Sequence, residues 1–206
     1  MIERQILRVI YSPFKAFEDI VKNPSAKGPL LILALGVALA AIAGFVSFSK
    51  VDVQLESETG PYVPLITTST FGARIFLVAV DEAISLSLAW LILVGMILLV
   101  IKLFRMQEGS WKALFFVVGY TLITSVVGTL ITALCIFPLP TVQLGWGIWN
   151  PTTQEMMDTA HQGILKAYEI WFSSPTYRFL SYLPYIVQVW ATALAAISIR
   201  ALLGVS

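Results

Sequence analysis

Residues 83–101 read AISLSLAWLILVGMILLVI, an uncharged stretch of 19 residues that is enclosed by Glu82 and Lys102. A helix of about 20 apolar residues is long enough to cross the roughly 30 Å hydrocarbon core of a bilayer. Because no charge would have to enter the membrane within this stretch, and a charge stands at either end, the stretch predicts a transmembrane helix.

Three further apolar stretches have similar lengths, and they lie at residues 29–49, 112–137 and 179–199. With helical flanks included, the predicted spans cover about residues 29–49, 75–104, 111–137 and 179–203. Of the 206 residues, 58% are hydrophobic and only 12% are charged, whereas soluble domains carry about 25% charge. The sequence therefore predicts an all-α fold, a polytopic transmembrane helix bundle with four spans in a single membrane domain, residues 1–206.

The composition argues against several classes of function. A net charge of +1 gives no reason to expect a nucleic-acid partner, and a lone cysteine cannot form an internal disulfide. The sequence contains no phosphate-binding loop, zinc-protease motif or nucleophile elbow. Glu155, Asp158 and His161 are three residues apart, but a solvated helix face explains them better than a metal site does. We therefore expect no catalytic residue, no metal and no cofactor.

Basic residues are distributed unevenly between the two sides of the predicted bundle. The segment before the first span contains five of them: Arg4, Arg8, Lys15, Lys22 and Lys27. The loop between spans two and three is also basic, whereas two long loops, about residues 50–74 and 138–178, are rich in acids. Since cytoplasmic loops carry an excess of Lys and Arg, we predict that both termini are cytoplasmic and both long loops lie outside.

Residues 1–28 are predicted to form a cytoplasmic amphipathic segment. Its apolar residues recur at helical spacing, with a break at Ser12-Pro13: Ile2, Ile6, Val9, Ile10, Phe14, Phe17 and Val21. Such a helix lies in the membrane interface, and its basic residues favour anionic lipids. A second interfacial amphipathic helix is expected in the outer loop, from Thr152 to Trp171. The bilayer is thus the first expected partner.

Small and polar residues mark the faces along which the spans should pack. Gly36, Ala40 and Gly44 are four residues apart in span one, and small residues at this spacing let a second helix approach closely. Span three carries a polar face that includes Thr121, Thr124, Ser125 and Gly128. We expect this face to meet protein, either within the chain or in a homo-oligomer.

Asp81 and Glu82 are the leading candidates for an ion or polar site, together with Arg74, Thr121, Thr124 and Ser125. Acids near a membrane segment are costly and often functional, which favours a cation or proton site. The simpler interpretation places the two acids at the membrane interface, where charges cost little, and we favour it.

Two stretches carry a resemblance to a known family. SPFKAFEDIVKNPSAKGPLL (12–31) has a Pro-x-x-x-Phe turn, a short charged helix and a proline before span one. KLFRMQEGSWKALFFVVGY (102–120) has a Gly-Ser/aromatic hairpin that leads into Gly119-Tyr120. Both, and the closing VWATALAAISIRALLGVS, resemble the prokaryotic Yip-domain family, the Ypt/Rab-interacting membrane proteins.

The resemblance implies a membrane protein with no transferable catalytic residues. Eukaryotic members of the family bind small GTPases and help membrane traffic. The family commonly has a proline after Gly-Tyr and usually has five spans, whereas here residues 121–124 contain no proline and we predict four spans.

The sequence leads to two hypotheses about function. The first is a non-enzymatic integral membrane protein of a prokaryotic cell membrane, which organises membranes or binds a membrane-protein partner as a scaffold. The second is a small transporter or channel subunit that uses Asp81, Glu82 and the polar face of span three.

Overall fold

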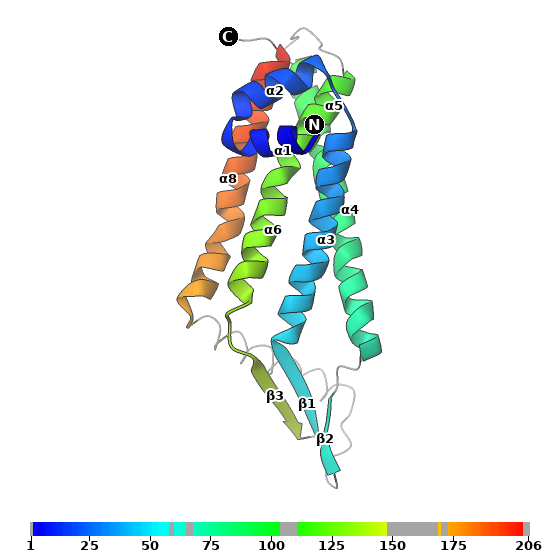
Figure 1. Cartoon of the computed structure of the whole chain (residues 1–206), viewed down its shortest axis with the longest axis vertical. Helices are drawn as coiled ribbons and strands as arrows, with labels where there is room; N and C mark the ends of the chain where they lie inside the picture. The colour runs from blue at the N-terminus through cyan, green and yellow to red at the C-terminus, as the bar shows by residue number, and fades with distance from the viewer. Residues whose placement is uncertain are drawn as a thin grey trace. The chain divides into compact units, whose positions relative to one another are not determined.

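A computed structural model of the chain describes residues 2–57, 60–64, 68–103, 111–147, 169 and 173–203. Among these residues, four helical segments are long and apolar enough to cross a membrane. They are α3 (Lys27–Ser49), Ile75–Lys102 within α4 (Thr68–Leu103), Trp111–Ile136, and α8 (Pro175–Leu203) (Figure 1). The prediction of an all-α polytopic helix bundle is confirmed.

Two short helices precede the first span, α1 (Ile2–Tyr11) and α2 (Pro13–Lys22). Ser12 separates them, and Pro13 begins α2 at a position where its missing N–H is not needed. Asn23 ends α2 through a hydrogen bond from its backbone N–H to the Asp19 carbonyl. The predicted amphipathic segment and its break at Ser12-Pro13 are thus both present.

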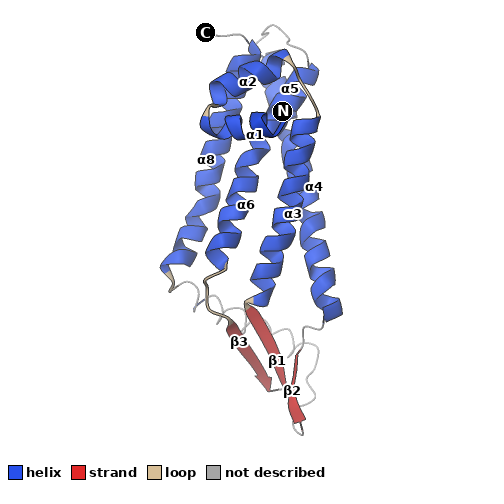
Figure 2. Ribbon diagram, in the orientation of Figure 1, coloured by secondary structure: helices blue, strands red, loops and turns tan. Residues whose placement is uncertain are grey.

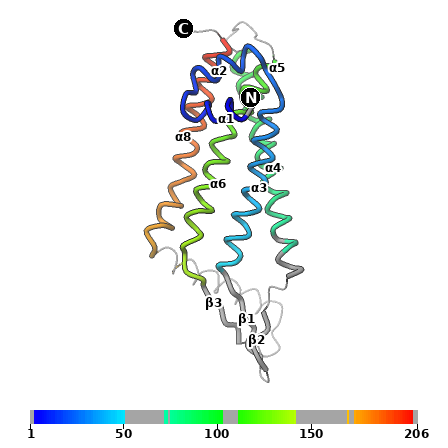
Figure 3. The backbone as a smooth tube through the Cα atoms, viewed as in Figure 1, coloured from blue at the N-terminus to red at the C-terminus, as the bar shows by residue number. Residues whose placement is uncertain are grey.

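The third span is interrupted rather than continuous. It consists of α5 (Trp111–Gly119), a 3₁₀ turn η1 (Tyr120–Leu122) and α6 (Ile123–Ile136), which Figure 3 follows along the backbone. This span is also the most buried of the four, because 61% of its apolar window is buried, against 17–28% for the other three spans. A mid-helix 3₁₀ turn marks local strain or a hinge, and the sequence analysis did not predict it.

A small sheet of three strands is drawn in red in Figure 2, with β1 (Val51–Ser57) between β2 (Gly60–Pro64) and β3 (Val142–Gly147). β2 pairs antiparallel with β1, and β3 pairs parallel with it. The sequence predicts outer loops at about residues 50–74, where β1 and β2 lie, and 138–178, where β3 lies. Val51, Val53 and Leu55 alternate with polar residues, however, and this period of two is the usual signal of a strand.

The chain divides into two compact units. Unit 1 comprises Met1–Ala40, Ala79–Thr129 and Pro184–Ser206, and unit 2 comprises Ala41–Val78 and Leu130–Leu183. The main apolar core, which includes Phe17, Ile32, Trp90, Val117 and Leu194, belongs entirely to unit 1. The predicted external helix from Thr152 to Trp171 lies outside the described residues, apart from Glu169.

Candidate functional site

The helices α1 and α2 pack on unit 1 through one apolar face. Val9 and Phe17 are fully buried, and Ile6 and Ile20 are nearly so. α2 contacts α5, and α1 contacts both α2 and η1 (Figure 1). We call α1 and α2 together the cap, and the end of unit 1 where they lie the cap end. Much of the apolar face that the sequence predicted to lie on lipid is therefore covered by protein.

Charged residues connect the two cap helices to each other and to α8. Arg8 Nη1 of α1 lies 2.8 Å from Asp19 Oδ2 of α2, in a pair whose side chains are 36% and 47% exposed. An exposed pair of this kind contributes about 0.2–1 kcal/mol, so it aligns the helices more than it stabilises them. The Arg200 guanidinium of α8 lies 5.6 Å from the centre of the Phe14 ring.

Tyr120 is the residue around which the cap end is built. Its side chain is fully buried, and its hydroxyl donates a 3.4 Å hydrogen bond to Gln5 Oε1 of α1. Its ring and hydroxyl lie so close to Gly28, at the start of α3, that a Cβ atom at this position would overlap them. Only glycine fits at residue 28 while Tyr120 keeps this position.

Gly119 makes the second close approach. A Cβ atom there would lie 2.6 Å from Pro29 Cβ and 2.7 Å from Trp90 Cζ2, distances that real Cβ atoms essentially never show. The Trp90 indole N–H donates a 2.8 Å hydrogen bond to the Phe115 carbonyl, and the two rings stack with centroids 4.4 Å apart. Trp90 therefore fixes α4 against α5 by both a polar and an aromatic contact.

These contacts join the two stretches that carried the family resemblance. Phe17, Gly28 and Pro29 belong to residues 12–31, and Gly119 and Tyr120 belong to residues 102–120. The structure packs the two stretches on each other in one buried cluster. Sequence spacing could not show this, because the stretches are separated by more than 70 residues.

The hydroxyls of the predicted polar face bond within their own helix. Thr121 Oγ1 donates to the Val118 carbonyl at 2.7 Å, and Thr124 Oγ1 donates to the Thr121 carbonyl at 2.9 Å. Both threonines are buried, and Ser125 is half-buried. Hydroxyl bonds to a preceding carbonyl bend helices, and these two coincide with the 3₁₀ turn. Their donors are used in the helix rather than presented to a pore.

Asp81 and Glu82 lie deeper along the bundle than the end of a span. A Cβ atom at Gly36 would lie 2.7 Å from Leu86 Cδ1, so these two residues are level. α3 and α4 run in opposite directions (Figure 1). Glu82 therefore lies level with about Ala40, near the middle of α3. Asp81 is exposed and Glu82 is half-buried.

The structure does not bring the acids and the hydroxyls together. Leu86 and Val126 both approach Gly36 of α3, so the three residues lie at about the same height along the axis of unit 1. Glu82 lies four residues from this level, on the side away from the cap end. Thr121 lies five residues from it, on the side toward the cap end. At 1.5 Å per residue the two are roughly 13 Å apart along the axis. The side chain of Arg74 lies outside the described part of the chain.

At the cap end, α4 extends further along the bundle axis than α3 does. By the same pairing of Gly36 with Leu86, the start of α3 at Gly28 is level with about Val94 of α4. α4 continues for eight more residues to Lys102, which is roughly 12 Å. The cap lies at the same end of unit 1 (Figure 1).

The predicted packing residues lie at close contacts within each unit. In unit 1, a Cβ atom at Gly36 would meet Leu86, one at Gly128 would lie 2.8 Å from Val187 Cγ2, and Ala40 is buried. In unit 2, a Cβ atom at Gly44 would lie 3.2 Å from Val78 Cγ1. Whether these residues also serve a contact between copies stays a prediction.

The cap has a second apolar side that faces away from the core. Leu7, Ile10 and Tyr11 are 56%, 37% and 71% exposed, and their spacing of three and four places them on one helix face. We call these three residues the α1 surface. Arg4 and Lys15 are also exposed. α1 is only 10 residues long, so it cannot cross a bilayer.

Sequence reasoning missed several residues of this cluster. Trp90 was seen only as part of an apolar run, and Gln5 was given no role. The available signal was Gly28-Pro29 and Gly119-Tyr120, two small-residue positions beside a proline and an aromatic residue. Their mutual contact needs the tertiary fold.

Comparison with known proteins gives one match. The model of the Yip1 domain family matches residues 7–206, which include the second half of α1, all of α2 and all four spans. No curated protein and no solved structure matches the chain.

Proposed function

We propose, from the premise that this chain belongs to the Yip1 domain family of membrane proteins, that it is a non-enzymatic scaffold. In this role it holds a partner protein at the membrane surface through its cap. The lack of catalytic motifs in the sequence supports a binding role over a chemical one.

The α1 surface is the observation that carries this proposal. One face of α1 is used to pack on η1 and α2, and yet Leu7, Ile10 and Tyr11 remain exposed on another. One apolar face is enough to pack a short helix on the rest of a protein, so the second apolar face of α1 is left free for another contact. Aromatic residues such as Tyr are enriched at protein interfaces, and a neighbouring basic residue adds charge selectivity.

We place the cap on the cytoplasmic side of a prokaryotic cell membrane. The support is the excess of basic residues in the segment before α3 and between α4 and α5, where cytoplasmic loops carry them. The α1 surface then faces the cytoplasmic leaflet and any protein bound there.

Site-directed photocrosslinking in native membranes tests the proposal. A photoreactive residue at Tyr11 is expected to give discrete protein adducts after illumination. The matched control is Leu35 of α3, which is 45% exposed within a membrane span and should give lipid adducts only. An adduct of twice the chain's mass at Tyr11 would identify the partner as a second copy of this chain.

Two results would count against a scaffold role for the cap. One is the absence of protein adducts at Tyr11, and the other is the same adduct pattern at Tyr11 and Leu35. In either case the α1 surface would not be a dedicated protein-binding surface.

A further inference from the structure

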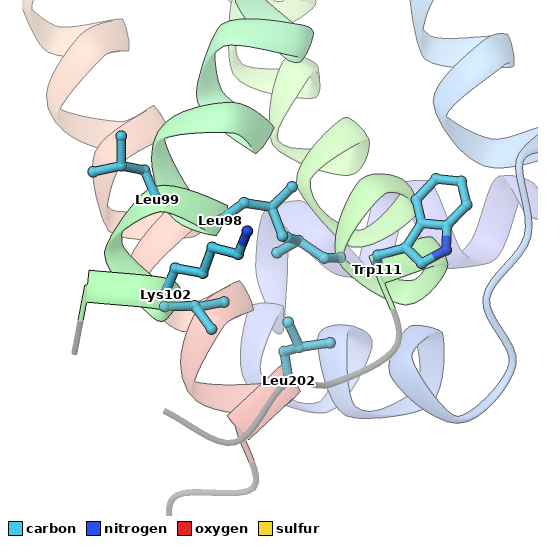
Figure 4. A pocket seen from close by; sticks show the side chains of 7 residues that line it. Leu98, Leu99, Lys102, Trp111 and Leu202 are labelled. Atoms are coloured by element: carbon cyan, nitrogen blue, oxygen red, sulfur yellow. The ribbon is translucent and has the colours of Figure 1, made fainter. Parts of the chain in front are cut away.

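A pocket of about 270 Å³ opens between α4, α5 and α8 at the cap end of unit 1 (Figure 4). Its lining is apolar except for Lys102, and the apolar lining residues include Leu98, Leu99, Trp111, Leu114 and Leu202. A water molecule occupies about 30 Å³ in the liquid, so the pocket has room for a chain of several heavy atoms.

Lys102 brings a positive charge to this apolar pocket. In Figure 4 its side chain runs into the middle of the group, with the ammonium beside Leu98. The residue is exposed and makes no ion pair with any residue that the structure describes. Its aliphatic stem can therefore cover apolar surface while its charge stays at the rim.

The helices around the pocket carry further positive charge and little negative charge. Lys112 follows Trp111 on α5, and Arg200 precedes Leu202 by two residues on α8. Within the described parts of these three helices, the acids are Asp81 and Glu82, which lie between about five and six turns of α4 from Lys102. The described part of the rim is therefore basic, and a negative group on a ligand would complement it.

We infer that this pocket binds one anionic phospholipid of the adjacent leaflet. An acyl chain lies along Leu98, Leu114 and Leu202, and the phosphate pairs with Lys102 at the rim. A lipid fits better than a soluble anion, because the walls are apolar and only the rim is charged. Basic pockets between membrane helices are a known setting for anionic headgroups, and Trp111 is of the type that lies at the headgroup level.

The test is native mass spectrometry of the purified full chain in a neutral detergent, titrated with phosphatidylglycerol or phosphatidylcholine of identical acyl chains. The wild type is expected to retain one phosphatidylglycerol at concentrations where phosphatidylcholine is lost. Lys102→Gln should weaken phosphatidylglycerol binding by about fivefold, the effect of one basic residue near an anionic surface. Phosphatidylcholine binding should change little.

Two variants provide the controls. Lys15→Gln removes an equally exposed charge from α2, away from the pocket, and should leave the preference unchanged. Leu98→Trp narrows the pocket and should weaken retention of both lipids. Thermal unfolding checks that each variant is folded. If Leu98→Trp does not fold, the lipid preference of Lys102→Gln still tests the inference.

Three results would overturn the inference. They are equal retention of the two lipids by the wild type, an equal loss of preference in Lys102→Gln and Lys15→Gln, and displacement of the lipid by millimolar inorganic phosphate. The last result would mean that the rim binds a soluble anion without help from the apolar walls.

Discussion

At the scale of single residues, the cap end depends on two positions where a side chain has no space. Gly28 lies against Tyr120, and Gly119 lies against Pro29 and Trp90. The sequence predicted close packing at Gly36 and Gly44 from their spacing alone, because helix periodicity is visible in one segment. It could not assign this role to Gly28 or Gly119, because the atoms that fill the space come from other elements.

Gly119→Ala should destabilise the protein by about 1–3 kcal/mol, since the added methyl group overpacks a core already closed by Pro29 and Trp90. Gly95→Ala in α4 is the matched control, because no atom lies within 4 Å of the added methyl group. The control should be neutral or stabilise by up to about 1 kcal/mol, since alanine favours a helix over glycine. Unfolding in mixed detergent, followed by circular dichroism, measures both. Equal effects of the two changes would contradict the close contact at Gly119.

At the scale of elements, a sequence pattern that lies within one segment predicts the local structure of that segment. Structure that depends on contacts with distant segments could not be predicted in this way. The break between α1 and α2 follows from Ser12-Pro13, and the spans follow from their uncharged lengths. The turn η1 contains neither proline nor glycine, so it has no composition signal. The pair of hydroxyl bonds from Thr121 and Thr124 coincides with it, and only the structure shows these bonds. β1 had a period-two signal, but its partner β3 is about 90 residues away in the chain.

Phe17→Ala should detach the cap from α5. The side chain is fully buried, and Phe→Ala changes in cores cost about 3–5 kcal/mol. Phe14→Ala is the matched control on the same helix, because Phe14 is 51% exposed and loses mainly its contact with Arg200. Limited proteolysis after Lys22 measures the result, with faster cleavage expected for Phe17→Ala alone. Cleavage at the same rate in both variants would mean that the cap is not held by its buried face.

At the scale of the whole molecule, the fold class and the family could be predicted from the sequence, but the candidate site could not. Length and charge suffice for a four-span bundle. The role of Asp81 and Glu82 was inferred from the charges at the ends of one apolar run. Such a run contains no information about how far the neighbouring helices extend along the bundle axis. Only the contact between Gly36 and Leu86 shows that the acids are level with the middle of α3.

The orientation of the chain remains a prediction, and cysteine labelling tests it. In a Cys135→Ala background, which leaves the chain without cysteine, single cysteines are placed at the exposed positions Asn23 and Thr141. We expect a membrane-impermeant maleimide to label Thr141→Cys in intact cells, and Asn23→Cys only after permeabilisation, because basic segments stay inside. The reverse pattern would place the cap outside and would remove the cytoplasmic setting of the proposed function.

The unequal heights of α3 and α4 at the cap end have a consequence for the surrounding membrane. The apolar surface of α4 extends up to Lys102, whereas that of α3 ends at the charge of Lys27, roughly 10 Å deeper. A bilayer of uniform thickness cannot match both helices. The annular lipids must tilt or thin on one side of the protein, at a cost of fractions of a kcal/mol per Å. We expect such a step to make the stability of the protein depend on the thickness of the surrounding bilayer.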